Sequence, residues 1–356
     1  MKVLFVFAVP SGGVETLNRQ RCAALKAAGI EGHCLYLLPG FGLQNSREFP
    51  TFVTNDDNEL RNLFAVQRYD AMVVVTGYFW IYRFRTLGFT GKIILEFQGI
   101  APKESARELL LDAKETVELH ANGLLNPGTP FIDSLIRELY PNTPQFRFNN
   151  CLDFKRFSYR PVPRPPHRIV AWLGRIEANK NWAEFLVIGH HLIYGVDRNI
   201  RLWMFEDHSL SRPVDRQQFE YWIDMLKLRE YLTIRSNVPH DHMPEYFSMI
   251  GDSGGFLCCT SKSEGAPYSV LEAMSCRCPV LTTDSEGVRS SVIQNRTGLY
   301  YTLGNFPEAV DQAHRLLTDH PLRERLRNEA LLHVRRHFDP GHYAVQFKRM
   351  LRELGL

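Results

Sequence analysis

The segment Ser261–Thr283, SKSEGAPYSVLEAMSCRCPVLTT, joins a Gly/Pro loop to an apolar helix pattern and then to a short β-branched run. This order predicts strand, loop, helix and strand, the repeating unit of doubly wound α/β domains. Glu264 lies in the loop, and Glu272 lies among apolar residues of the helix. A carboxylate buried in such a surface needs hydrogen-bond partners. Either glutamate alone could be an ordinary solvated residue, but the pair flanking a Gly/Pro loop favours a binding site.

The start of the helix in this segment offers a second kind of binding group. The backbone amides of its first turn, from about Tyr268 to Leu271, have no acceptors within the helix. A phosphate at a helix N-terminus accepts hydrogen bonds from such amides. Carboxylates accept hydrogen bonds from hydroxyl groups, and backbone amides donate hydrogen bonds to an anion. A nucleotide-sugar carries both hydroxyl groups and phosphates. We therefore predict that this segment binds a nucleotide-sugar.

The same alternation of strands and helices extends along the chain. Apolar runs predict strands at residues 2–9, 33–38, 71–76, 92–98, 168–173, 200–205, 232–238, 255–260 and 280–283. Residues 40–58 are polar and are predicted to be irregular. Helix patterns at 307–318, 322–337 and 341–354 close the chain, with a break at Pro340.

The length of the chain predicts two domains. A chain of 356 residues exceeds one typical hydrophobic core, so we expect two α/β domains. The stretch at 160–167 contains four prolines in eight residues, which is typical of a stiff linker. We therefore place one domain at residues 1–160 and the other at residues 167–338.

Composition excludes several classes of protein. Hydrophobic and charged fractions of 44% and 23% are those of a folded globular protein, and a net charge of +3 is too small to indicate nucleic-acid binding. The seven cysteines are odd in number and widely spaced, which argues against a disulfide framework. The apolar run at 3–10 lacks a cleavage site and fits a buried strand better than a signal peptide. No run approaches transmembrane length, so we predict a cytoplasmic protein.

Two loops that follow predicted strands carry groups suited to phosphates. Gly12 and Gly13 follow the first strand and open a helix, so the backbone there can approach a ligand closely. The turn matches neither GxGxxG nor a P-loop, which argues against NAD and ATP. Arg175 and Lys180 follow the first strand of the second domain and could neutralise a diphosphate. Taken alone, these two cations would more often be solvated loop residues.

Together these motifs resemble those of the retaining GT-B glycosyltransferases of family 4, the glycosyl transferases group 1. Glu264 and Glu272 match the family's Glu-x7-Glu motif, residues 174–181 match Gly-Arg-x4-Lys-Asn, and residues 12–15 match Gly-Gly-Val-Glu. The resemblance covers nearly the whole chain. It implies two Rossmann-like domains that face a cleft, with a last helix at about 341–356 that crosses back to the first domain.

The resemblance implies transfer of a sugar from a nucleotide-diphosphate donor to an acceptor hydroxyl, with retention of configuration and without a metal cofactor. The donor would bind the second domain, and a sugar or lipid-linked acceptor would bind the first. The product would serve bacterial-type polysaccharide, glycolipid or glycoconjugate synthesis. Peripheral contact with the inner face of a membrane is compatible with such an acceptor.

The resemblance also assigns roles to single residues. Arg175 and Lys180 would bind the diphosphate and stabilise the leaving group. Glu272 would bind the ribose hydroxyls, and Glu264 would bind hydroxyls of the transferred sugar. Other residues expected at the donor are Gly12, Gly13, Val238 near the base, Gly265, Ala266, Pro267, Tyr268, Ser269 and Val270.

The chain departs from the family pattern at one position. Many family members carry a histidine near the transferred sugar, and Gln98 stands at that position here. A glutamine can hydrogen-bond a sugar hydroxyl but cannot transfer a proton. A GT-B epimerase or phosphorylase is one alternative, and Gln98 disfavours the epimerase, which would need an acid or base at the sugar. A non-catalytic nucleotide-sugar-binding protein is the other alternative.

Two further segments are candidate sites. His240, Asp241 and His242 are adjacent in a loop, and adjacent ligands rarely converge on one metal ion, so we predict no metal site. Residues 77–85 are rich in aromatic side chains. Core packing is the favoured interpretation of this segment, and an acceptor pocket or a membrane contact are the alternatives.

Overall fold

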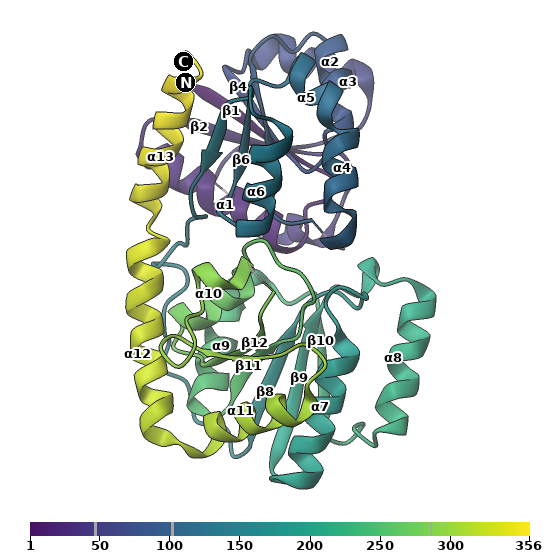
Figure 1. Cartoon of the computed structure of the whole chain (residues 1–356), viewed down its shortest axis with the longest axis vertical. Coiled ribbons are helices and arrows are strands. Elements are labelled where there is room, and N and C mark those ends of the chain that lie inside the picture. The colour runs from purple at the N-terminus through teal and green to yellow at the C-terminus, as the bar shows by residue number, and fades with distance from the viewer. Residues whose placement is uncertain (46–47, 101–102, 286) are drawn as a thin grey trace. The chain divides into compact units, whose positions relative to one another are not determined.

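The computed structural model describes residues 1–45, 48–100, 103–285 and 287–356. These residues form two compact units, the first made of residues 1–153 with 338–356 and the second of residues 154–337. Each unit is built on one parallel sheet covered by helices (Figure 1). The chain therefore has the two α/β domains expected from the alternation of strand and helix patterns.

The first unit contains a seven-stranded sheet in the order β3-β2-β1-β4-β5-β6-β7. Its strands are β1 (Lys2–Phe7), β2 (Glu31–Tyr36), β3 (Thr51–Val53), β4 (Ala71–Val75), β5 (Lys92–Glu96), β6 (Gly123–Asn126) and β7 (Gln145–Arg147). Its helices are α1 (Gly12–Ala27), α2 (Asp57–Gln67), α3 (Phe79–Thr86), α4 (Ala106–Asp112), α5 (Lys114–His120), α6 (Pro130–Leu139) and α13 (Pro340–Glu353). The order reverses at β1, as in doubly wound sheets.

The central strands of the first unit are buried on both faces, because helices cover each side of the sheet. Successive residues of β1 point to opposite faces. Val3 and Phe5 pack with α1 and α13, whereas Leu4 and Val6 pack with helices α2 to α6. Figure 1 shows α13 beside α1, which it contacts. The last helix therefore belongs to the first unit although it follows the second in sequence.

The second unit contains a six-stranded parallel sheet in the order β10-β9-β8-β11-β12-β13. Its strands are β8 (Arg168–Leu173), β9 (Ile200–Glu206), β10 (Leu232–Ser236), β11 (Phe256–Cys259), β12 (Val280–Thr283) and β13 (Leu299–Tyr301). Its helices are α7 (Trp182–Gly195), α8 (Pro213–Met225), α9 (Met243–Asp252), α10 (Tyr268–Ser275), α11 (Phe306–Thr318) and α12 (His320–His337). Helices α9 and α10 contact β11, and α10 also contacts β12.

The boundary between the units differs from the predicted one. The first unit ends at Asp153, so residues 154–160 belong to the second unit and not to the first. Phe157 is fully buried there, and its carbonyl accepts a hydrogen bond from Ser275 of α10. Local composition does not reveal this long-range packing of Phe157. It does reveal the prolines at 160–167, which is why the boundary was predicted there. The proline-rich stretch therefore lies within the second unit.

The prediction for one other segment is wrong, and the prediction for a second is confirmed in part. Residues 40–58, predicted to be irregular, contain the short strand β3 and a 3-10 turn at Phe41–Gln44. The aromatic segment forms α3, which buries Ile81 and Phe84 in the core and leaves Phe79 and Tyr82 largely exposed. Core packing thus explains one side of this helix.

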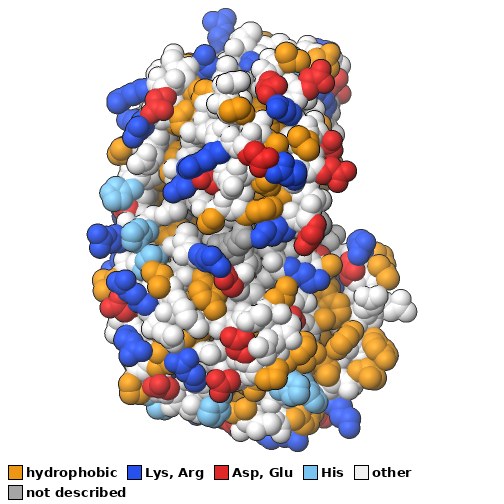
Figure 2. Space-filling model, viewed as in Figure 1, with side chains coloured by type: hydrophobic (Ala, Val, Ile, Leu, Met, Phe, Trp, Pro, Cys, Tyr) orange, Lys and Arg blue, Asp and Glu red, His pale blue; other side chains and the backbone are white. Residues whose placement is uncertain are grey.

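The surface shown in Figure 2 carries Lys and Arg side chains interspersed with Asp and Glu. This mixture agrees with the small net charge of the chain. Over the ranges that the structure describes, no helix has the length and apolar composition needed to cross a bilayer.

Candidate functional site

Lys180 and Glu264 lie at the carboxyl ends of two neighbouring strands of the second sheet. Lys180 follows β8 and Glu264 follows β11, and these strands pair in parallel. The Lys180 ammonium donates a hydrogen bond to the Glu264 carboxylate, and both side chains are largely buried. Ligands of open α/β sheets bind at this edge. The structure thus brings together two of the predicted site residues that are 84 positions apart.

The charge of Lys180 is set by opposing effects. Burial lowers the pKa of its ammonium, but the interactions with Glu264 and Cys259 together outweigh burial, and the net pKa is raised. The Arg175 charge acts in the other direction and lowers this pKa. The ammonium therefore stays charged near neutral pH, with a second cation close enough to influence it.

Asn179, which the sequence interpretation had not singled out, joins the two loops. Its side-chain amide donates to the Ser263 carbonyl over 3.0 Å and accepts from the Ser263 amide over 3.2 Å. The Lys262 amide donates to the Asn179 carbonyl over 2.9 Å. The Thr260 hydroxyl binds the Lys180 carbonyl over 2.9 Å. These bonds hold the loop of Lys180 against the loop of Glu264.

Glu272 is buried on α10 with a side chain that is 3% exposed. Its Oε1 lies 2.8 Å from Nε2 of His240, which belongs to the 3-10 turn His240–His242 after β10. The buried carboxylate therefore has a polar partner, as burial demands. The sequence presents His240 only as a candidate metal ligand, because its position beside Glu272 depends on a contact between distant segments.

The loop between the two glutamates is closely packed. Residues 265–267 lead from Glu264 into α10, whose first residues are Tyr268, Ser269 and Val270. A Cβ on Gly287 would lie 2.1 Å from the Glu264 carbonyl oxygen, so only glycine fits there. Gly287, a second residue absent from the prediction, also donates its amide to that carbonyl over 3.1 Å.

Two of the first-turn amides of α10 that were predicted to bind a phosphate already have an acceptor within the protein. The amides of Val270 and Leu271 donate to the Pro267 carbonyl over 3.2 and 3.4 Å. The prediction that all four amides are available to a phosphate is therefore wrong for Val270 and Leu271.

Arg175 and Val238 lie in loops at the same edge of the second sheet, after β8 and β10. The Arg175 guanidinium is half exposed and pairs with Glu177 over 3.0 Å. Exposure and a weakly held partner leave this side chain able to reorient toward an anion.

The remaining predicted residues belong to the first unit. Gly12 and Gly13 open α1, and Gly12 has a φ of +70°, which favours glycine. Gln98 follows β5, and its amide donates to Glu96 over 2.8 Å and to Asn150 over 3.1 Å. The Asn150 amide donates back to the Gln98 carbonyl over 2.7 Å. The amide expected to meet a sugar hydroxyl is thus already held by protein groups.

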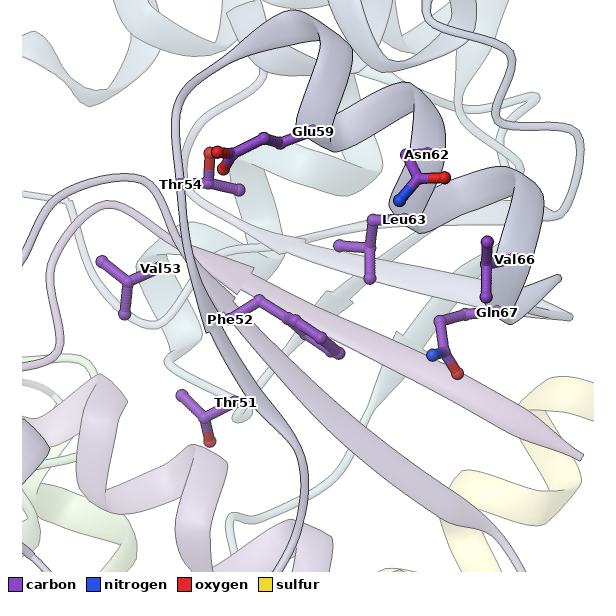
Figure 3. Close-up of a pocket in the computed structure, with 9 residues that line it drawn as sticks. All are labelled: Thr51, Phe52, Val53, Thr54, Glu59, Asn62, Leu63, Val66 and Gln67. Carbon is purple, nitrogen blue, oxygen red and sulfur yellow. The ribbon is translucent and has the colours of Figure 1, made fainter.

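The first unit also contains a cavity that lies apart from the predicted site residues. A cavity of about 430 Å³ lies between edge strand β3 and helix α2 (Figure 3). Among the described residues, its lining comprises Thr51, Phe52, Val53, Thr54, Glu59, Asn62, Leu63, Val66 and Gln67. It contains none of the predicted site residues, so it is a separate feature of the fold.

Two doubly wound parallel sheets in one chain, with the last helix packed on the first unit, define the GT-B fold. Sucrose-phosphate synthase from Thermosynechococcus elongatus has this fold, with a TM-score of 0.81, 15% identity and 99% coverage of both chains. HepE from Anabaena, solved with UDP-glucose, has a TM-score of 0.82 and 15% identity over 99% of this chain and 100% of its own.

Residues 157–333 match the model of the family described as glycosyl transferases group 1. Alpha-D-kanosaminyltransferase from Streptomyces kanamyceticus is 27% identical over 53% of this chain and 46% of its own length. The capsular polysaccharide biosynthesis glycosyltransferase CapM from Staphylococcus aureus is 24% identical over 44% of this chain and 38% of its own. The matches thus span less than half of these relatives.

Proposed function

We propose that the chain is a glycosyltransferase that moves a sugar from a nucleotide-diphosphate-sugar to an acceptor hydroxyl with retention of configuration. The observation that carries this proposal is the Lys180–Glu264 ion pair at the carboxyl edge of the second sheet, together with the buried Glu272 on α10, the helix that follows the Glu264 loop. The family match and the names of the two curated relatives support it. The complex of HepE with UDP-glucose supports a nucleotide-sugar as the donor.

The roles follow from the chemistry of each group. Arg175 and Lys180 hold the diphosphate as negative charge develops on it. Positive groups held in place near such a developing charge stabilise the transition state, and this effect is often a large part of catalysis. Glu264 accepts hydrogen bonds from hydroxyls of the transferred sugar, and Glu272 accepts them from the ribose. The bond from the anomeric carbon to the diphosphate breaks, and a bond to the acceptor oxygen forms. The acceptor proton passes to the leaving diphosphate.

The acceptor is a saccharide or a lipid-linked saccharide bound by the first unit, in polysaccharide, glycolipid or glycoconjugate synthesis. Gly12 and Gly13, which open α1 of the first unit, contact the acceptor. Gln98, held by Glu96 and Asn150, shapes this region and does not transfer protons. We place the enzyme in the cytoplasm, with peripheral contact at the inner face of the membrane when the acceptor is lipid-linked.

The proposal is tested with purified protein and a panel of UDP-, GDP- and ADP-sugars, with and without saccharide acceptors. Thermal shifts identify donors that bind the folded state. Release of the nucleoside diphosphate measures transfer, and NMR of the product gives its anomeric configuration. We expect one donor class to bind and react, and Lys180→Ala to serve as a control with strongly reduced activity. No binding or reaction across the panel would contradict the function, a changed sugar without release would indicate an epimerase, and an inverted product would contradict retention.

A further inference from the structure

We propose that His240 is a positioning residue that fixes Glu272 for recognition of the ribose hydroxyls of a nucleotide. This inference rests on the proposed function. His240 Nε2 and Glu272 Oε1 are 2.8 Å apart, and their side chains are 14% and 3% exposed. An ionised carboxylate accepts about four hydrogen bonds, so one bond from His240 leaves capacity for two hydroxyl donors. A ribose presents two adjacent hydroxyls.

The ring of His240 is held by the segment at 154–160. Its centroid lies 4.6 Å from that of Phe157, whose side chain is fully buried. The Phe157 carbonyl accepts a hydrogen bond over 2.5 Å from Ser275, which lies on α10, as does Glu272. Phe157 therefore contacts both the histidine and the helix that carries the carboxylate.

Two arginines of the same segment fix the turn that carries His240. Arg156 forms an ion pair with Asp241. The Arg160 guanidinium donates to the Asp241 carbonyl over 3.3 Å and to Glu245 over 3.1 Å. The backbone of the turn is thus tied by side chains on both sides of Phe157. This explains why residues 154–160 belong to the second unit.

These contacts matter because they hold His240, and through it the Glu272 side chain, in one position. A glutamate has several rotatable bonds, and ordering them during binding weakens affinity. A carboxylate already held in one orientation meets the diol without that loss. A histidine that merely satisfied a buried charge would stabilise the fold but would not affect discrimination between ribose and deoxyribose. This difference separates a positioning role from a purely structural one.

The experiment measures binding of UDP, GDP and ADP to the full chain by calorimetry, and then of the 2′-deoxy form of the nucleotide that binds most tightly. We expect the wild type to bind the ribonucleotide about 10-fold or more tightly than the deoxynucleotide, the effect of one charge-assisted hydrogen bond. His240→Leu should reduce this ratio toward one. His240→Gln, whose amide can replace Nε2–H, should retain most of it, whereas the shorter His240→Asn should not.

His242→Leu is the matched control, because His242 lies in the same turn and is exposed. It should keep the wild-type ratio. Retention of the full ratio in both His240→Leu and His240→Asn would overturn the inference. A wild type that binds nucleotides without preferring ribose would also overturn it. In either case the proposed function would still stand. If no nucleotide binds the wild type, the proposed function itself fails. Should His240→Leu not fold, the comparison of the Gln and Asn variants decides.

Discussion

The Lys180 ammonium interacts with two negatively charged groups in the proposed reaction. It neutralises Glu264 within the protein, and in the proposed reaction it also binds the donor diphosphate. A diphosphate carries more negative charge than one carboxylate, so a second cation is needed beside it. Arg175 meets this need, since its charge already influences Lys180 and its side chain is half exposed. The two cations should therefore act as a unit.

Substitution of these cations should show coupling. We expect Arg175→Ala and Lys180→Ala each to cost about 2–4 kcal/mol of transition-state stabilisation, as for loss of one electrostatic donor. The double variant should cost less than the sum, because one cation alone cannot hold the diphosphate. The measurements are kcat/KM and the melting temperature. Arg175→Ala should leave the melting temperature unchanged, and near wild-type kinetics in Lys180→Ala would contradict the assignment.

The pH dependence of the Lys180–Glu264 pair has a definite direction. The folded-state pKa of Lys180 is raised above 10.5. Its stabilisation is therefore fully present below the unfolded-state pKa and is lost only as pH rises through the folded-state value. We expect the difference in unfolding free energy between wild type and Lys180→Met to be constant from about pH 7 to about pH 9 and to shrink above about pH 10.5. A difference that fell steadily across the neutral range would show that another group controls it.

The two glutamates should affect different kinetic parameters. Glu272→Ala removes binding that is common to the ground and transition states, so KM should rise with little change in kcat. Glu264→Ala removes contacts to the reacting sugar, so kcat should fall. Initial rates over a range of donor concentrations separate the two effects. Equal changes of both parameters in both variants would argue against this division.

Elements with long periodic patterns could be predicted from the sequence, and short or tertiary features could not. The last three helices begin and end within two residues of the predicted bounds. Strands β3, β7 and β13 have three residues each, too few for a periodic signal. Lys180 and Glu264 were predictable because each lies in a motif. The contacts of Asn179 and His240 join distant segments, and no local pattern records them.

Helix α13 should be essential to the stability of the first unit. Phe347 is fully buried, and its ring centroid lies 5.9 Å from that of Phe5 on β1. Phe347→Ala should destabilise the protein by about 3–5 kcal/mol, the usual cost of removing a buried phenylalanine. Val345→Ala, on the exposed side of the same helix, should change stability by less than about 0.5 kcal/mol. Guanidinium unfolding monitored by circular dichroism measures both, and equal midpoints would show that α13 is not part of the core.

The two units differ in the kind of similarity that relates them to known proteins. The second unit carries the family match, which covers residues 157–333. The first is related to known proteins through the fold, since the solved structures that span it share only 15% identity. Donor chemistry is therefore the part of the function that residues support directly, and the acceptor must be sought by experiment.

We expect the proposed transfer to proceed without a divalent metal. In the proposed reaction, Arg175, Lys180 and the N-terminus of α10 supply the positive potential that a metal would otherwise bring to a diphosphate. Transfer should therefore persist in excess EDTA, with a known metal-dependent transferase as the control for effective chelation. Lys180→Ala gives a sharper test, because Mg²⁺ should stimulate this variant more than the wild type if the lysine replaces a cation. Loss of wild-type activity in EDTA, restored by Mg²⁺ or Mn²⁺, would mean that these cations do not suffice to bind the leaving group.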